Sequence, residues 1–228
     1  MAELRGLQDR LWAERTRSVL MVLQGTDAAG KDGTIRHVFT GLNPHGCRVD
    51  DFAQPSSTDL AHDYLWRVHA KCPARGQIGI WNRSHYEDVI AVRVHGLEPP
   101  AVWRKRYRHI CEFERMLVDE GTTIVKILLH MSRAQQAKRL RQRIADPTKR
   151  WKFRPEDAAD RRRFGDIEAA YEQAITKTST AWAPWHIVPA DHRWVRNAAV
   201  TRLLLHTLRG LRPEFPQMTV DLSQIDLD

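Results

Sequence analysis

The sequence predicts an α/β fold in which a parallel β-sheet carries helices on both faces. Short apolar runs alternate along the chain with longer stretches of helical periodicity, as in strands that are joined through helices. Residues 19–23 are all apolar, which is typical of a strand buried on both faces of a parallel sheet. A glycine-rich segment follows this strand, and ligands in such folds bind where the strands end.

The apolar and β-branched runs predict strands over residues 18–24, 48–52, 77–82, 122–130 and 185–189. Helical periodicity predicts helices over residues 31–42, 57–71, 101–120, 156–177 and 197–208, with a short helix through Val89. A further, basic helix begins at Ser132, which Gln135 complements in a capping box, and a loop at 146–155 ends it.

The composition excludes a membrane-spanning or disulfide-rich protein. Hydrophobic residues make up 42% and charged residues 28% of the chain. No stretch approaches the ~20 apolar residues that cross a bilayer, and residues 1–5 are too polar for a signal peptide. The three cysteines are too widely spaced to indicate disulfides or zinc. We therefore expect a cytoplasmic protein without a membrane partner.

Positive charge is concentrated in one segment. The net charge is +8, and residues 133–163 contain 12 Lys/Arg against 4 Asp/Glu, so the rest of the chain is balanced. Such a segment indicates a polyanionic partner, among them nucleotide phosphates, polyphosphate, nucleic acid or an anionic membrane. A solvated helix face is the alternative interpretation.

Residues 25–33, Gly-Thr-Asp-Ala-Ala-Gly-Lys-Asp-Gly, have the spacing of a phosphate-binding loop. Glycines let backbone amides converge on an anion, and the next helix directs its positive end to the same point. These features predict a P-loop kinase-like domain over residues 1–228, with a basic helical lid at about 133–165 and a tail at about 211–228. The positions expected to bind phosphate here are Gly25, Ala28, Ala29, Gly30, Lys31, Asp32, Gly33 and Thr34.

Two acids in this loop predict a bridging cation. The Ser/Thr that usually follows the lysine and holds magnesium is replaced by Asp32, and Asp27 lies inside the loop. Carboxylates so close to phosphates need a cation between them, which favours Mg²⁺. Asp32 has the alternative role of stabilising the helix N-terminus.

The third predicted strand delivers further polar residues to the same edge. It ends in Asn82, and Arg83 is suited to neutralising a phosphoryl group in transfer. Glu87 either closes a capping box with Ser84 or acts as an active-site acid. Asp88 is a candidate metal ligand or base.

The basic helix and its loop form the predicted lid, which closes on phosphates and excludes water. Arg139 and Arg143 are four residues apart and share a helix face. Arg139, Arg150, Lys152 and, at the end of the third strand, Asn82 are candidates for binding phosphate or nucleotide. Trp151 and Phe153 either stack on a base or, as the favoured interpretation, pack in the core.

The chain resembles the polyphosphate kinase 2 family in four segments that extend over nearly its whole length. These are residues 25–33, Asn-Arg-Ser-His-Tyr-Glu-Asp-Val at 82–89, Asp-Pro-Thr-Lys-Arg-Trp-Lys-Phe at 146–153 and Pro-Ala-Asp-His-Arg-Trp at 189–194. The second segment looks like the form found in the third class of the family. Phe164-Gly165 departs from the family pattern of Trp followed by a polar residue.

The resemblance implies a P-loop kinase fold with a helical lid and Mg²⁺-dependent, reversible transfer from inorganic polyphosphate to ADP or AMP. It leaves guanine nucleotides open and implies a homodimer or homotetramer. By position, it implies catalytic roles for Asp27, Lys31, Arg83 and Arg143, and a phosphate-binding role for Lys152. We expect metal ligands among Asp27, Glu87 and Asp88.

Two other functions remain open from the sequence. An ATP-dependent kinase for a small molecule or nucleoside monophosphate shares the loop but has no need of so extended a basic segment. A basic nucleic-acid-binding module explains the positive charge but does not explain the phosphate-binding loop. Nucleic acid is therefore not the expected partner.

Overall fold

The parallel sheet expected from the sequence is present in the computed structural model, which describes residues 1–52 and 54–218. All neighbouring strands pair in parallel. In spatial order, the strands are β2 (Cys47–Asp51), β3 (Ile78–Asn82), β1 (Ser18–Gly25), β4 (Thr122–His130) and β5 (Trp185–Pro189). The central β1 is buried at every position, as its apolar sequence predicts.

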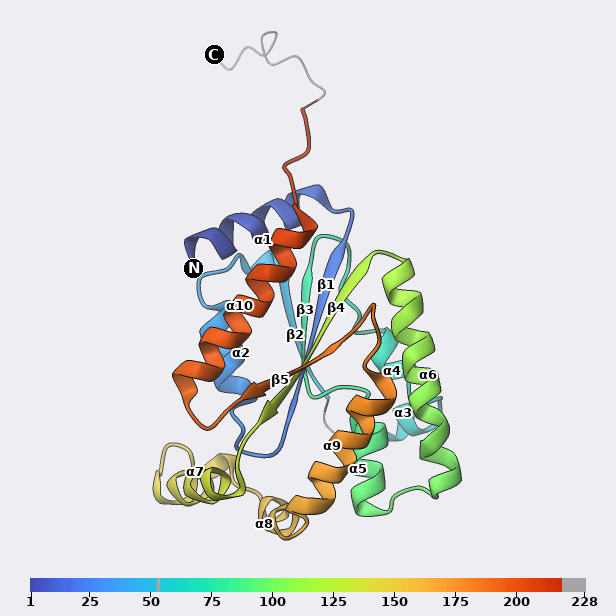
Figure 1. The fold of residues 1–228 in the computed structure, drawn as a ribbon, viewed down its shortest axis with the longest axis vertical. Coiled ribbons are helices and arrows are strands. Elements are labelled where there is room, and N and C mark those ends of the chain that lie inside the picture. The colour runs from blue at the N-terminus through green and yellow to red at the C-terminus, as the bar shows by residue number, and fades with distance from the viewer. Residues whose placement is uncertain (53, 219–228) are drawn as a thin grey trace.

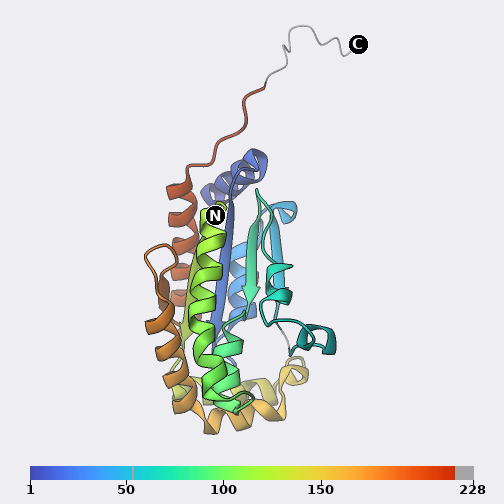
Figure 2. The ribbon, with the colours of Figure 1, turned by 90° about the vertical axis from the view of Figure 1, so that its right-hand side faces the viewer.

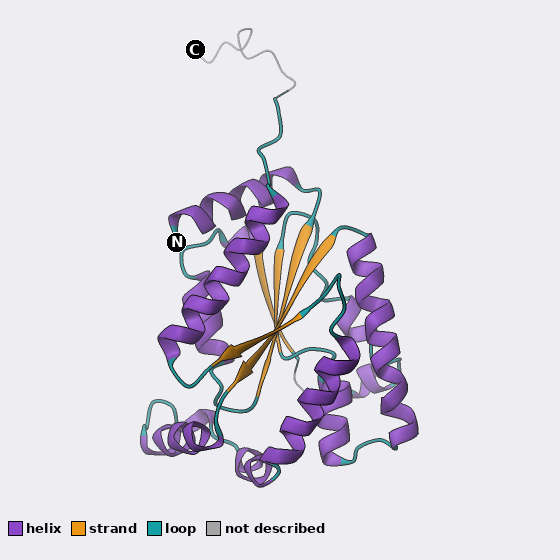
Figure 3. Ribbon diagram, viewed as in Figure 1, coloured by secondary structure: helices purple, strands orange, loops and turns teal. Residues whose placement is uncertain are grey.

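Helices cover both faces of the sheet because alternate residues of each strand point to opposite sides (Figure 1). Val19, Met21 and Leu23 pack with one set of helices, α1 (Ala2–Glu14), α2 (Lys31–Phe39) and α10 (Arg193–Leu211). Leu20 and Val22 pack with the other set, α5 (Glu87–His95), α6 (Pro100–Asp119) and α9 (Phe164–Thr178). Figure 3 shows the strands enclosed between these two helical layers.

Two further helices lie at the end of the sheet where the strands terminate, below the layers in Figures 1 and 2. These are α7 (Arg133–Ala145) and α8 (Pro155–Arg162), with a 3₁₀ turn at Arg150–Lys152 between them. This segment is the part of the chain for which the sequence predicts a lid. The remaining short elements are a 3₁₀ turn at Pro44–Gly46, α3 (Ser57–Leu60) and α4 (Trp66–His69).

Three helix predictions were wrong in detail. The single helix expected over 57–71 is two short helices, since the Asp63 carboxylate accepts a hydrogen bond from the Leu65 amide at 2.9 Å and makes a turn between them. The helix expected over 156–177 is interrupted at Arg163, and Phe164 is buried where α9 begins. The last helix begins at Arg193 and ends at Leu211, so it is longer at both ends than expected.

The helix α1 was not predicted, although Leu4 and Leu11 on one of its faces are fully buried against the sheet layer. Residues 212–218 of the expected tail have no regular structure, and residues 219–228 of it lie outside the described residues. No helix in residues 1–52 and 54–218 has the length and apolarity needed to cross a membrane.

A buried polar network fixes the loop after β3. The Lys126 ammonium, in the middle of β4, donates to Glu114 Oε2 at 2.5 Å, to the Tyr86 hydroxyl at 3.0 Å and to the Thr178 carbonyl at 2.7 Å. The Tyr86 hydroxyl in turn donates to Glu114 Oε1 at 2.9 Å. Because Tyr86 belongs to the segment that carries Arg83, the network holds this segment against the sheet.

Removing only one partner of the Lys126–Glu114 pair is expected to destabilise the fold strongly. Lys126→Met removes the ammonium that balances the buried Glu114 charge and leaves it the Tyr86 hydroxyl and His85 as neighbours, which costs about 3–5 kcal/mol of unfolding free energy. Urea unfolding measures this cost, and Lys105→Met on the exposed face of α6 is the matched control. A loss below about 1 kcal/mol, like that of a surface substitution, would contradict this assignment.

Candidate active site

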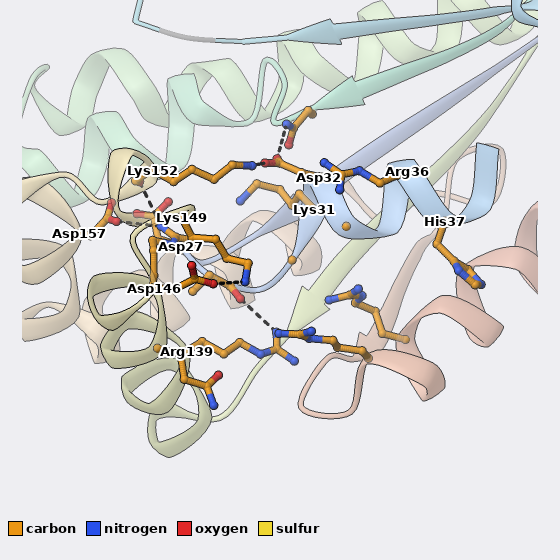
Figure 4. Close-up of a pocket in the computed structure, with 18 of the residues that line it drawn as sticks. Asp27, Lys31, Asp32, Arg36, His37, Arg139, Asp146, Lys149, Lys152 and Asp157 are labelled. Atoms are coloured by element: carbon orange, nitrogen blue, oxygen red, sulfur yellow. Dashed lines mark hydrogen bonds and ion pairs between the residues drawn. The ribbon is translucent and has the colours of Figure 1, made fainter. Parts of the chain in front are cut away.

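A cavity of about 1560 Å³ opens at the carboxyl end of the sheet, between the P-loop (residues 25–33), the lid (residues 133–162) and the start of α10. Its wall is strongly basic, with ten lysines and arginines against five aspartates (Figure 4). The basic residues are Lys31, Arg36, Arg83, Arg139, Arg143, Lys149, Lys152, Arg154, Arg193 and Arg196. The acidic ones are Asp27, Asp32, Asp51, Asp146 and Asp157.

The P-loop has the left-handed backbone turns that such a cradle requires. Gly30, the N-cap of α2, has φ 100°, and Ala28 has φ 66°. The left-handed region costs a non-glycine residue about 1–2 kcal/mol, so Ala28 marks a strained turn inside the site. The turn leaves the first amides of α2 without carbonyl partners in the helix, which is the usual basis of anion binding at a helix start.

Lys31 is held inside the P-loop. Its ammonium donates to the Gly25 carbonyl at 2.6 Å, and its side chain is buried at the cavity wall. Burial, together with the nearby positive charge of Arg83, lowers the pKa of Lys31. An anion bound in the cavity opposes this shift, because its negative charge stabilises the charged lysine.

The two acids of the P-loop face basic residues from other parts of the chain. Asp27 Oδ1 lies 3.0 Å from Arg83 Nη2 and 3.9 Å from Arg154 Nη2. Burial raises the pKa of Asp27, but the charges of Lys31, Arg83 and Arg154 outweigh it and hold this pKa below its usual value.

Asp32 connects the P-loop to the lid. Its carboxylate accepts hydrogen bonds from Lys152 Nζ at 2.7 Å and from Asn82 Nδ2 at 3.2 Å. The Lys152–Asp32 contact joins residues 120 positions apart in the sequence and closes the cavity on one side (Figure 4).

The segment after β3 brings Asn82 and Arg83 into the cavity wall but not the two acids that follow. Arg83 has φ 63°, so its backbone is also in the left-handed region. The capping box expected between Ser84 and Glu87 is absent. The helix α5 begins at Glu87 after the N-cap Tyr86, and Ser84 Oγ accepts a hydrogen bond from the Tyr86 amide.

Glu87 and Asp88 lie behind the cavity rather than in its wall. Burial raises the pKa of Glu87 despite the charges of Arg83 and Lys31. Asp88 faces Arg67 at 3.7 Å and Arg106 at 3.8 Å, on the side of α5 that packs against other helices. The structure therefore does not bring Asp88 together with the P-loop acids.

The lid residues divide into two groups. Arg143 and Lys152 line the cavity, and Arg143 Nη1 pairs with Asp157 Oδ2 at 3.0 Å. Arg139 also lies at the wall, but both of its Nη atoms donate to backbone carbonyls. Arg150 lies outside the wall and donates to the Ile144 carbonyl within the lid.

The remaining predicted P-loop residues have supporting positions. Gly25 ends β1, and its amide donates to the Tyr171 hydroxyl at 3.2 Å. Ala29 and Thr34 are buried beneath the loop. Ala28, Gly30 and Gly33 line the cavity.

The residues present fit a magnesium ion that is bound partly by substrate. No cluster of three or more His, Cys, Asp or Glu side chains suited to a metal occurs in residues 1–52 and 54–218. Mg²⁺ in phosphate-transfer sites is commonly bound by one or two carboxylates together with substrate phosphates. Asp27 is suited to this because its pKa is low and its carboxylate lies at the cavity wall.

The sequence analysis missed several residues of the wall, above all Arg36, Arg193 and Arg196 on α2 and α10. Arg193 lies in the fourth segment that resembles the family, which was the available signal for this region. Lys149 and Arg154 were within the recognised basic run but were not assigned to the site.

The family of the chain follows from comparisons with known proteins. The family model described as Polyphosphate kinase 2 (PPK2) matches residues 1–216. An AMP/ADP-polyphosphate phosphotransferase from Meiothermus ruber is 55% identical over 94% of this chain and 80% of its own length. An ADP-polyphosphate phosphotransferase from Rhodopseudomonas palustris is 43% identical over 95% of this chain and 79% of its own length.

The fold agrees with this result. The crystal structure of polyphosphate kinase 2 from Arthrobacter aurescens TC1 superposes with a TM-score of 0.95 and 42% sequence identity. It covers 97% of this chain and 80% of the crystallised one. With a P-loop, a basic lid and one cavity between them, this chain belongs to the polyphosphate kinase 2 family.

Proposed function

We propose that the protein transfers the terminal phosphoryl group of inorganic polyphosphate to ADP or AMP, reversibly and with Mg²⁺. The observation that carries the proposal is the cavity wall, where ten basic residues from the P-loop, lid and α10 face one space. A polyanionic donor and a nucleotide acceptor together supply the negative charge that such a wall stabilises. The relatives named above act on polyphosphate with AMP or ADP.

The chemistry needs little beyond positioning and charge neutralisation. The attacking phosphate oxygen of the acceptor is already an anion, so no strong general base is required. Lys31 and the first amides of α2 bind phosphate oxygens of the P-loop ligand. Arg83, which follows β3, and Arg143, on the lid, both line the cavity and stabilise the charge of the group in transfer.

Magnesium would supply positive charge against the phosphates of the substrates. Asp27 is the residue that we expect to hold it. Asp27 is paired with Arg83 and Asp32 with Lys152, so the acids hold these basic groups at the cavity wall. Lid closure over the phosphates excludes water, which otherwise competes as acceptor.

The wider setting is part of the same proposal. We expect the enzyme to act in the cytoplasm, where nucleotides are available, and as a homodimer or homotetramer. The three cysteines are free thiols, which agrees with a reducing compartment. The assay that tests the adenine nucleotides as acceptors also tests guanine nucleotides.

A luminescent assay for ATP tests the proposed reaction directly. Purified protein with Mg²⁺, ADP and long-chain polyphosphate is expected to form ATP, and AMP in place of ADP is expected to form ADP and then ATP. Omission of polyphosphate or addition of EDTA are the controls. Transfer from ATP to another acceptor, with no use of polyphosphate, would instead indicate a conventional kinase.

Lys31→Ala is expected to reduce turnover by at least about 100-fold, because it removes the charge that the P-loop directs at the phosphates. Lys105→Ala on α6 is the control of equal charge change. Circular dichroism checks that the fold is retained. A Lys31→Ala protein with near-normal turnover would refute the assigned mechanism.

Arg143→Ala is expected to raise the KM for long-chain polyphosphate about tenfold, since one charge-assisted contact contributes roughly 1.5–3 kcal/mol. Lys138→Ala, exposed on the same helix, is the matched control. Arg143→Lys keeps the charge and is expected to give an intermediate KM. Identical kinetics of Arg143→Ala and the unchanged protein at every chain length would show that Arg143 does not contact the donor.

A further inference from the structure

Two buried arginines from separate helices lie under the P-loop. Arg139 on α7 and Arg196 on α10 are 8% and 3% exposed. Arg139 Nη1 donates to the carbonyls of Ala28 and Ala29, each at 3.0 Å, and Arg196 Nη1 donates to the Ala29 carbonyl at 3.1 Å. The two guanidinium groups therefore meet at one carbonyl of the loop.

The closeness of Arg196 explains why the loop needs glycine at position 30. A Cβ atom there would lie 1.9 Å from Arg196 Nη1, in addition to the strain of a φ of 100°. At Gly33, a Cβ atom would lie 3.4 Å from Arg196 Nη2. The guanidinium thus lies against the start of α2, where the phosphate-binding amides are.

These contacts keep the amides of α2 available. The Ala28 and Ala29 carbonyls are the atoms to which the Asp32 and Gly33 amides would donate if the helix extended one turn earlier. The arginines occupy these carbonyls instead. Within the described residues, the amides of Lys31, Asp32 and Gly33 donate no hydrogen bond outside the helix, so they remain free for an anion.

Neither guanidinium forms an ion pair with a carboxylate in the described part of the chain, and only the more distant charge of Asp191 favours the charged form of Arg139. Arg139 Nη2 donates to the Ala190 and Asp191 carbonyls, and Arg196 Nη2 donates to the Asn197 amide oxygen. The Asp191 carboxylate accepts a hydrogen bond from the Ser132 amide. Burial, followed by the charges of Arg139 and Arg193, lowers the pKa of Arg196 to about 10.

Buried charge without a counter-charge is costly, and the positive end of α2 adds to the repulsion. A phosphate chain in the cavity supplies the missing negative charge.

We propose that Arg139 and Arg196 are positioning residues that orient the P-loop amides, and that bound phosphate supplies most of the counter-charge that this pair lacks within the protein. The pair therefore destabilises the ligand-free enzyme and strengthens phosphate binding. This inference rests on the proposed function, because it requires phosphate in the P-loop.

The test compares thermal unfolding of the unchanged protein, Arg196→Gln and Arg202→Gln, each with and without Mg²⁺-tripolyphosphate. Arg202 is exposed on the same helix and provides an equal change of charge. We expect Arg196→Gln to have a ligand-free Tm no lower than that of the unchanged protein. Its Tm increase on adding tripolyphosphate is expected to fall by more than half, whereas Arg202→Gln keeps the full increase.

Steady-state kinetics supply a second readout. Arg196→Gln is expected to raise the KM for the polyphosphate donor about tenfold, equivalent to 1.4 kcal/mol, with a smaller effect on kcat. Arg196→Lys keeps the charge and is expected to restore most of the donor affinity.

A purely structural brace gives the opposite pattern. Arg196→Gln would then lose several degrees of ligand-free Tm, or fail to fold, while any folded protein kept the full response to tripolyphosphate. Either result overturns the inference and leaves the proposed function intact if the unchanged protein still transfers phosphate. Absence of a tripolyphosphate response in the unchanged protein would instead remove the proposed donor, and the inference with it.

Discussion

The site depends on the turn between β1 and α2, which gathers backbone amides and the buried Lys31 around one point. Such a concentration of positive charge is unfavourable inside a protein unless acids or ligands balance it. Asp27 and Asp32 supply part of this balance, and each also draws a basic residue from elsewhere in the chain, Arg83 and Lys152. The same electrostatic requirement that favours phosphate thus brings the end of β3 and the lid to the P-loop.

The layers behind the cavity keep these groups in register. Gln24 hydrogen-bonds to Ser84 and to Tyr171, and Tyr171 also accepts from the Gly25 amide. Tyr171 belongs to α9, the helix that directly follows the lid. Tyr171 therefore connects the helix after the proposed lid to the start of the P-loop. This arrangement suits an enzyme that has to open for a long polyanion and close before transfer.

The fold and the P-loop could be predicted because their signals are local. The strand bounds at 122–130 and 185–189 agree with the structure, since short runs rich in apolar and β-branched residues favour strands. The Gly-x4-Gly-Lys spacing is likewise a local pattern that predicts the conformation of the phosphate-binding loop. The interruption at Arg163 had no such signal, because the helical periodicity continues through it.

The directions in which the side chains of the site point could not be predicted from the sequence. Glu87 and Asp88 are adjacent, but one residue rotates a helix by about 100°, which turns Asp88 towards Arg67 and Arg106. Arg139 was expected to bind phosphate, yet its donors go to loop carbonyls. Arg196 lies 165 residues after Lys31 in the sequence. Only the packing of α10 against α2 brings it under the P-loop.

The most direct test of the account is ³¹P nuclear magnetic resonance of the protein with Mg²⁺, ADP and polyphosphate, followed over time. The account predicts that the β- and γ-phosphate signals of ATP grow as polyphosphate is consumed, with little orthophosphate, because the lid excludes water. Growth of orthophosphate without ATP would show hydrolysis in place of transfer and would contradict the account.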